Sequence, residues 1–133
     1  MKTVCSCLLV VLVAITLACG YGSKNYNTPA AAGAIPAISE LSPDNTNAGA
    51  GAFTMIVNGS NFSSNSNVNW NGAPQRTTFV TGNQLMVAIP ASMTSTSGTA
   101  QITVTNPAST GNGPYGMGGK LAETSKPVNF TVN

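Results

Sequence analysis

Apolar residues recur at every second position in several short segments after residue 34. Phe53, Met55 and Val57 stand at alternate positions in GAFTMIVNG. A period of two is typical of a β-strand with one buried face. No segment after residue 34 repeats every 3.6 residues, so we expect almost no helix. Four further segments have the period of a strand: Val68 and Trp70; Leu85, Val87 and Ile89; Ala100, Ile102 and Val104; and Val128, Phe130 and Val132.

Turn-forming pairs separate these segments, and their spacing favours an antiparallel β-sandwich, in which two sheets enclose one core. Trp70 alternates with Val68 and should therefore face the core rather than form an aromatic platform for a ligand. The pairs are Pro43-Asp44, Asn58-Gly59, Asn71-Gly72, Gly82-Asn83 and Asn106-Pro107. The strand residues should fill the core together with Ile38, Leu41, Phe62 and Phe79.

The N-terminus has the pattern of a signal peptide. Met1 and Lys2 precede a run from Val4 to Ala18 that is too short to span a bilayer, which takes about 20 residues. The sequence TLACG at 16–20 resembles the lipobox of bacterial lipoproteins, although Thr16 replaces the usual leucine. This resemblance implies cleavage before Cys19 and lipidation of Cys19. The alternative is an ordinary secretory signal.

Three regions follow from these patterns: a signal peptide at 1–18, a lipid-attachment cysteine and flexible linker at 19–34, and one domain at 35–133. The linker consists mainly of Gly, Ala, Ser and Asn and shows no apolar period. A flexible chain of this length spans roughly 20 Å. We therefore expect an extracytoplasmic domain held close to the bacterial cell envelope by a lipid, or a secreted one.

Short motifs inside the domain resemble one family. FTMIVNGSNF at 53–62, VNWNG at 68–72 and GTAQITVTNP at 98–107 occur in the order found in the IPT/TIG domain. This immunoglobulin-like module is shared by plexins, some transcription factors and many bacterial surface proteins. The resemblance covers residues 35–133 and implies an immunoglobulin-like β-sandwich of the E-set type. It also implies no enzymatic activity, because the family has no catalytic motif to carry over.

Composition narrows the possible functions further. Charged residues make up 6% of the chain, and residues 19–133 hold four basic and three acidic side chains. The electrostatic field of so small a net positive charge is too weak to bind nucleic acid, which needs clustered Lys and Arg. Because the chain has no histidine, Ser-His and Cys-His pairs are excluded and the commonest transition-metal ligand is missing. We expect no catalytic residues, no metal and no cofactor.

The glycine-rich stretch GNGPYGMGGK at 111–120 matches G-x-G-x-x-G, yet no helix follows it. Because a dinucleotide site needs that helix, we expect no nucleotide binding. The stretch should belong to a long flexible loop, 106–125, between the last two strands. Loops at the ends of immunoglobulin-like folds often bind partners. The candidate binding residues are Asn112, Tyr115, Met117 and Lys120, although Tyr115 could instead cap the core.

The first functional hypothesis is therefore a non-catalytic lipoprotein with a structural or protein-binding role at the cell surface. Its partners would be the membrane, through the lipid anchor, and an envelope protein. The alternative is a carbohydrate-binding or adhesive module, because a neutral surface rich in Asn, Thr and Ser can hydrogen-bond to hydroxyl groups. The scarcity of charge also predicts edge-to-edge association at high concentration, opposed by Pro74, Pro107 and Pro127.

Overall fold

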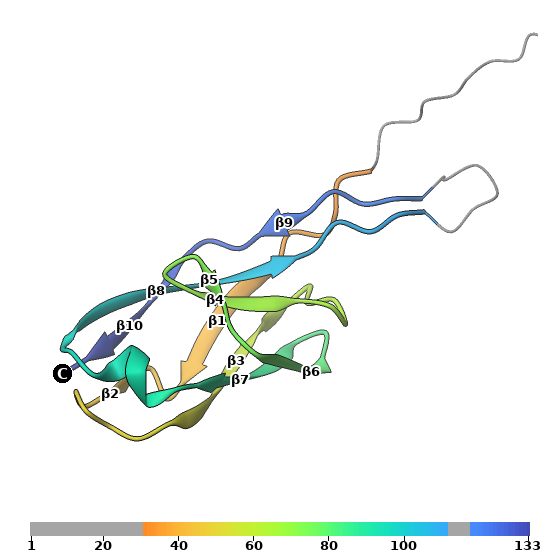
Figure 1. Cartoon of the computed structure of the whole chain (residues 1–133). Helices are drawn as coiled ribbons and strands as arrows, with labels where there is room; N and C mark the ends of the chain where they lie inside the picture. The colour runs from red at the N-terminus through yellow and green to blue at the C-terminus, as the bar shows by residue number, and fades with distance from the viewer. Residues whose placement is uncertain (1–30, 112–117) are drawn as a thin grey trace, which may run out of the picture.

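The computed structural model describes residues 31–111 and 118–133, which form two β-sheets packed face to face (Figure 1). The first sheet has four strands in the order β1-β3-β7-β6, and all its pairs are antiparallel. These strands are β1 (Ala37–Ser42), β3 (Phe53–Ser60), β7 (Gln84–Ile89) and β6 (Thr77–Thr81).

The second sheet follows the order β2-β10-β8-β4-β5, and the short β9 also pairs with β8. Its pairs are antiparallel except that between β2 and β10, which is parallel. In the described residues the helical content is a 3₁₀ turn at Ala91–Thr94. The predicted all-β sandwich is thus confirmed. The strands are β2 (Asn45–Thr46), β10 (Val128–Val132), β8 (Gly98–Asn106), β4 (Asn67–Trp70), β5 (Ala73–Pro74) and β9 (Glu123–Thr124).

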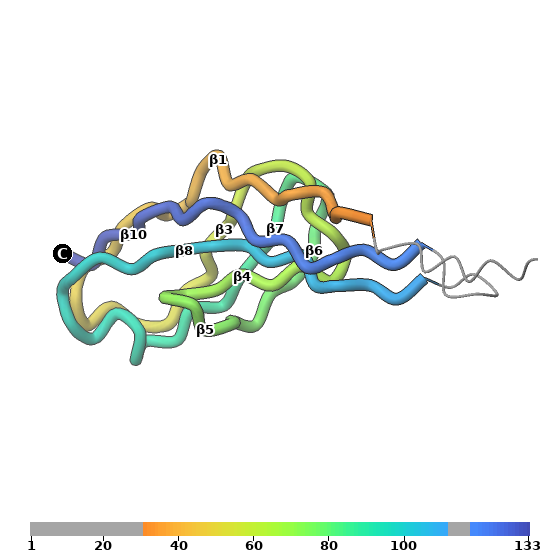
Figure 2. The backbone as a smooth tube through the Cα atoms, turned by 90° about the horizontal axis from the view of Figure 1, so that it is seen from above, coloured from red at the N-terminus to blue at the C-terminus, as the bar shows by residue number. Residues whose placement is uncertain are grey.

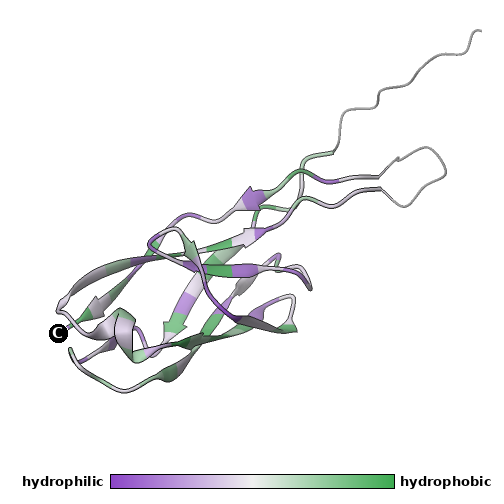
Figure 3. Ribbon diagram, viewed as in Figure 1, coloured by the Kyte–Doolittle hydropathy of each residue, from purple (hydrophilic) through white to green (hydrophobic). Residues whose placement is uncertain are grey.

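The core lies between the sheets and consists largely of the residues that the period of two selects. Apolar segments recur along the strands of both sheets in Figure 3. Trp70 is only 6% exposed, and its ring centroid lies 5.1 Å from that of Phe130, so the predicted core position is confirmed. The buried apolar residues are Leu41, Met55, Val57, Phe62, Val68, Trp70, Leu85, Val87, Ile89, Ala100, Ile102, Val104, Phe130 and Val132.

Two details of the predicted core and turns are wrong. Phe79 lies on β6, the last strand of its sheet, and remains 39% exposed because no strand of the described part covers that edge. Asn58-Gly59 is not a turn but part of β3. Gly59 is needed there because a Cβ would overlap with the carbonyl oxygen of Ala37 on β1. The chain turns instead at Asn61, which adopts a φ of 60°.

The predicted loop over 106–125 is also wrong where the structure describes it. Thr105 and Asn106 of β8 pair with Thr124 and Glu123 of β9, and the pairing continues at Ser109 and Lys120. Residues 107–111 and 118–124 thus form a hairpin stem that extends beyond the sandwich (Figure 2). The backbones of Ser109 and Lys120 pair although these segments lack the alternating apolar side chains from which a strand could have been predicted.

The N-terminal segment of the described chain joins this stem. The amide of Ala31 donates to the carbonyl of Gly119, and the amide of Leu121 donates to that of Ala31, each at 3.1 Å. We call this the hairpin end of the domain. Figure 1 shows Asn133 and the 3₁₀ turn Ala91–Thr94 at the opposite, distal end. A chain that continues from Ala31 toward Cys19 therefore leaves the domain at its hairpin end.

Candidate functional site

The loop 61–66 at the hairpin end is held by the side chain of Asn106. Its amide nitrogen donates to the carbonyls of Asn61, at 2.8 Å, and Ala34, at 2.9 Å. Its amide oxygen accepts hydrogen bonds from the hydroxyl of Ser66 and the backbone amide of Ser63. Asn106 is buried, so these bonds satisfy a side chain that water reaches poorly. Its role is to position the loop.

A groove of about 390 Å³ lies between this loop and the hairpin stem. Uncharged polar residues make up about half of its lining, Gly, Ala, Pro, Phe and Leu residues make up nearly all of the rest, and Lys120 is its charged member. The exposed side chains of Ser64, Asn65 and Lys120 can contact a ligand, whereas Asn106 has its hydrogen-bonding groups already occupied. The lining is Gly33, Ala34, Asn61, Phe62, Ser63, Ser64, Asn65, Asn106, Pro107, Ala108, Ser109, Lys120 and Leu121.

Of the predicted site residues, the structure describes only Lys120. Lys120 is exposed and lines the groove, while its backbone pairs with Ser109 on the other strand of the stem. Asn112, Tyr115 and Met117, like the lipidation candidate Cys19, lie outside the described residues. Sequence reasoning missed the groove because its far wall comes from loop 61–66. The loop is held by Asn106, which lies 40 residues later in the chain. A contact over this separation produces no recognisable motif in the sequence.

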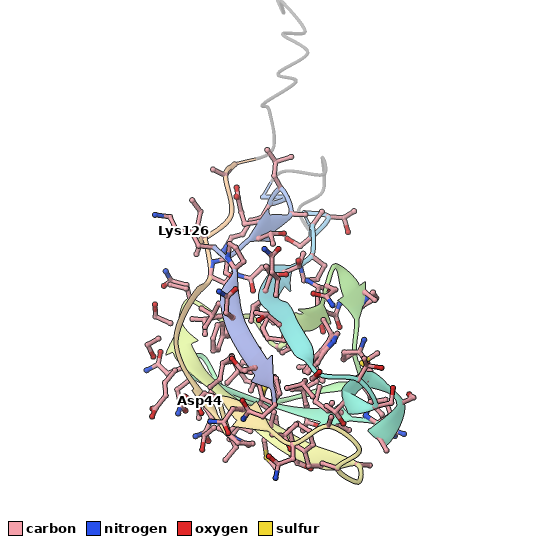
Figure 4. The ribbon with its side chains drawn as sticks, turned by 90° about the vertical axis from the view of Figure 1, so that its left-hand side faces the viewer. Asp44 and Lys126 are labelled. Carbon is pink, nitrogen blue, oxygen red and sulfur yellow. The ribbon has the colours of Figure 1, made fainter. Side chains whose placement is uncertain are left out.

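A second groove of about 500 Å³ lies along β1 and the turn that follows it, beside the start of β10. Glu40 and Asp44 line it together with Ser39, Ser42 and Asn129. Figure 4 shows Asp44 at one end of this side of the domain and Lys126 toward the hairpin end. Within the described ranges, no group of three His, Cys, Asp or Glu side chains is arranged to hold a metal ion.

The outer face of the second sheet is mostly polar, with Pro74 of β5 paired to Asn69 at its edge, and we call its polar part the amide-hydroxyl face. Ala100, Ile102 and Val104 of β8 point into the core, so the residues between them point outward. Strand register adds the neighbouring positions of β2, β4, β9 and β10. All members are uncharged: Asn45, Asn67, Asn69, Thr99, Gln101, Thr103, Thr105, Thr124, Asn129 and Thr131.

Hydrogen bonds between side chains order part of this face. The amide nitrogen of Asn69 donates to the hydroxyl oxygens of Thr103, at 3.2 Å, and Thr105, at 2.9 Å. The hydroxyls of Thr105 and Thr124 lie 2.9 Å apart. These contacts connect β4, β8 and β9 across the surface. Asn69 itself is buried, so it fixes the half-exposed hydroxyls of Thr103 and Thr105, while the exposed members of the face offer hydroxyl and amide groups to solvent.

Two sheets of mainly antiparallel strands pack around one apolar core, and this architecture is that of an immunoglobulin-like β-sandwich. The model of the IPT/TIG domain family matches residues 36–117, more than half of the chain. The chain belongs to the IPT/TIG domain family. The match identifies a non-catalytic domain and includes the groove-lining loop 61–66.

A comparison with curated proteins gave no significant match to this chain. Among the residues that the structure places, no helix has the length and apolar character required to cross a membrane.

Proposed function

We propose that the protein is a non-catalytic, lipid-anchored module of the bacterial cell envelope with a structural or protein-binding role at the surface. The observation that carries the anchoring is the sequence TLACG at 16–20, placed directly after an apolar run of signal-peptide length. Cleavage before Cys19 would leave a lipidated N-terminus twelve residues before Ala31.

The position of Ala31 supports this role. A tether that leaves at the hairpin end keeps the distal end and the outer faces of both sheets away from the attachment point (Figure 1). Partners in the envelope could then reach these surfaces without displacing the anchor. Twelve residues span about 20 Å as a flexible chain, so the domain acts close to its membrane.

Metabolic labelling with a clickable fatty acid in the producing bacterium tests the proposal. Wild-type protein should carry the label, and Cys19→Ser should lose it because Cys19 is the lipid-accepting residue of the lipobox-like sequence at 16–20. The matched controls Cys5→Ser and Cys7→Ser should keep the label, since both positions lie in the signal peptide. Wild-type protein that is produced and cleaved but carries no label would contradict the proposal.

A second candidate function, carbohydrate binding, is favoured by the amide-hydroxyl face. Its groups can donate and accept hydrogen bonds, and uncharged groups cost less to strip of water than charged ones. A neutral polysaccharide matches this chemistry because it carries hydroxyl groups and no charge. The face would therefore be the site at which such a ligand binds.

A glycan array with folded protein tests this candidate. Thr103→Glu places a charge in the centre of the face and should abolish binding of a neutral glycan. Thr54→Glu is the matched control, because Thr54 is exposed on β3 of the other sheet. A blank array, or equal binding by both variants, would contradict carbohydrate recognition on this face.

A further inference from the structure

The outer face of the first sheet carries an apolar pair at its centre. Ile56 of β3 and Met86 of β7 lie opposite each other in the ladder, and both point away from the core because the residues on either side of each are buried in it. Met86 is 40% exposed, although β7 lies in the interior of the sheet. Exposed apolar surface with a polar rim is typical of a protein–protein contact.

A carboxylate is fixed at one corner of this face. Glu40 lies on β1, at the edge of the sheet, in one row with Asn58 of β3 and Gln84 of β7. The side-chain amide of Gln84 donates to the side-chain oxygen of Asn58, at 3.1 Å, and the amide of Asn58 donates to the carboxylate of Glu40, at 3.4 Å. These hydrogen bonds direct the carboxylate over the outer face.

Arg76 lies at the opposite corner, just before β6. Its carbonyl accepts a hydrogen bond from the amide of Ala88, at 3.1 Å, and this bond continues the ladder in which Thr77 lies opposite the buried Val87. Thr77 points inward, so Arg76 points outward beside Ala88. Two strands separate β6 from β1, which places Arg76 about 14 Å from Glu40 across the strands. The two charges cannot pair within one chain.

The two corners are complementary to those of a second copy. Arg76 and Glu40 also lie about 14 Å apart along the strands, so the line between them crosses the face diagonally, and its midpoint falls between Ile56 and Met86. A two-fold axis in the plane of the face, perpendicular to this diagonal, brings each Glu40 opposite Arg76 of the other copy. The strands of the two copies then cross at about 90°, one of the two angles at which sheets pack.

We propose that the outer face of the first sheet is a self-association surface, on which two copies of this chain form a two-fold dimer. Reciprocal Glu40–Arg76 ion pairs surround a centre of Ile56 and Met86 from both copies. The inference goes beyond the proposed function and does not depend on the lipid anchor. Because the area between the corners, about 14 by 14 Å, is small beside the roughly 800 Å² that each partner buries in a standard interface, the dimer is weak and reversible.

This dimer keeps the two N-terminal segments on one side. The row of Glu40 lies nearer the hairpin end of the domain, and Arg76 lies nearer the distal end (Figure 1). The axis that exchanges these two corners therefore leaves the hairpin ends of both copies on the same side of the dimer. Two copies tethered to one membrane could still form it. The amide-hydroxyl face belongs to the other sheet and stays accessible.

Reversal of the two charges tests the dimer. Sedimentation equilibrium is measured on the whole chain from residue 19 onward with Cys19→Ser, so that no lipid contributes to association, and should show a monomer–dimer equilibrium at concentrations up to millimolar. Glu40→Arg and Arg76→Glu each replace both ion pairs by pairs of like charge, and each should raise the dissociation constant at least about tenfold. Lys126→Glu is the control for a change of net charge, because Lys126 is exposed at the start of β10 in the other sheet. It should dimerise like the wild type.

Restored association identifies the pairing. The double variant Glu40→Arg/Arg76→Glu has the net charge of the wild type and should dimerise again. An equimolar mixture of the two single variants should also dimerise, because the mixed dimer contains two pairs of opposite charge. Fluorescence of the buried Trp70 confirms that each variant is folded.

Three results would overturn the dimer: a wild-type chain that stays monomeric, single variants that associate as strongly as the wild type, or a mixture that does not associate. Pairing of two chains at the β6 edge would not reproduce the expected pattern, because Glu40 lies on β1 at the other edge of the sheet. The lipid anchor is absent from the measured chain, so none of these results bears on the proposed function.

Discussion

The side-chain oxygen of Asn106 accepts a hydrogen bond from the hydroxyl of Ser66, which joins the end of β8 to a loop 40 residues earlier in the chain. The same amide also bonds to the carbonyls of Ala34 and Asn61. One buried side chain thus connects the N-terminal segment, the loop 61–66 and the hairpin stem. The shape of the groove depends on this connection.

Replacing Asn106 should therefore destabilise the domain. Asn106→Ala leaves several partly or fully buried polar groups without partners, and we expect a loss of about 2 to 3 kcal/mol in the free energy of unfolding. Urea denaturation followed by Trp70 fluorescence measures it. Asn65→Ala, an exposed position in the same loop, should change the stability by less than about 0.5 kcal/mol. Equal stability of the two variants would show that the network contributes nothing.

Gly59 should tolerate no side chain. Gly59→Ala would drive a methyl group into the carbonyl of Ala37 and the ring of Phe62, and β1 would have to move away from β3. We expect a loss of at least about 2 kcal/mol, measured by thermal or urea unfolding. Gly51→Ala is the control, because its Cβ would meet no atom within 4 Å. That variant should be neutral or more stable by up to about 1 kcal/mol.

Phe130 should contribute more than Phe79 to the free energy of unfolding. Phe130 is fully buried between Phe53 and Trp70, with ring centroids at 5.9 and 5.1 Å. Phe130→Ala should cost about 3 to 5 kcal/mol. Phe79→Ala, at the exposed edge on β6, should cost about 1 kcal/mol. Denaturation curves of the two variants provide the comparison, and similar losses would contradict the exposed position of Phe79.

The exposed edge at β6 should support self-association at high concentration. Val80, 41% exposed, lies beside Phe79 on the last strand of the first sheet, and unpaired strand edges can template pairing with another chain. Val80→Lys should lower the association measured by sedimentation equilibrium. Thr96→Lys adds the same charge in the exposed distal turn and should lower it less. A wild-type domain that stays monomeric at millimolar concentration would contradict the prediction.

The sandwich could be predicted from sequence because each strand carries its own alternation of buried and exposed positions. Met55 and Val57, or Ile102 and Val104, identify a buried face without knowledge of any partner strand. The exposure of Phe79 could not be predicted, because it depends on β6 being an edge, and strand order is a property of the whole sheet.

Less of the candidate site than of the sandwich could be predicted from the sequence. The glycines at 111–120 suggested a loop, yet backbone pairing between Ser109 and Lys120 continues the β8–β9 ladder as a stem. Gly59 carried the signature of a turn, whereas its actual requirement is the close approach of β1. Asn106 likewise looked like part of a turn, although its amide organises three distant segments. Each of these depends on contacts between residues far apart in the chain.

The lipid anchor proposed at Cys19 would hold this immunoglobulin-like domain at a membrane. Intact mass spectrometry of the protein purified from the membrane fraction tests it most directly, with Cys19→Ser as the comparison. With the anchor, the mature wild-type chain should begin at Cys19 and carry the added mass of a diacylglycerol group, and the variant should show no such addition. An unmodified wild-type chain, whether cleaved near residue 18 or still full length, would contradict it.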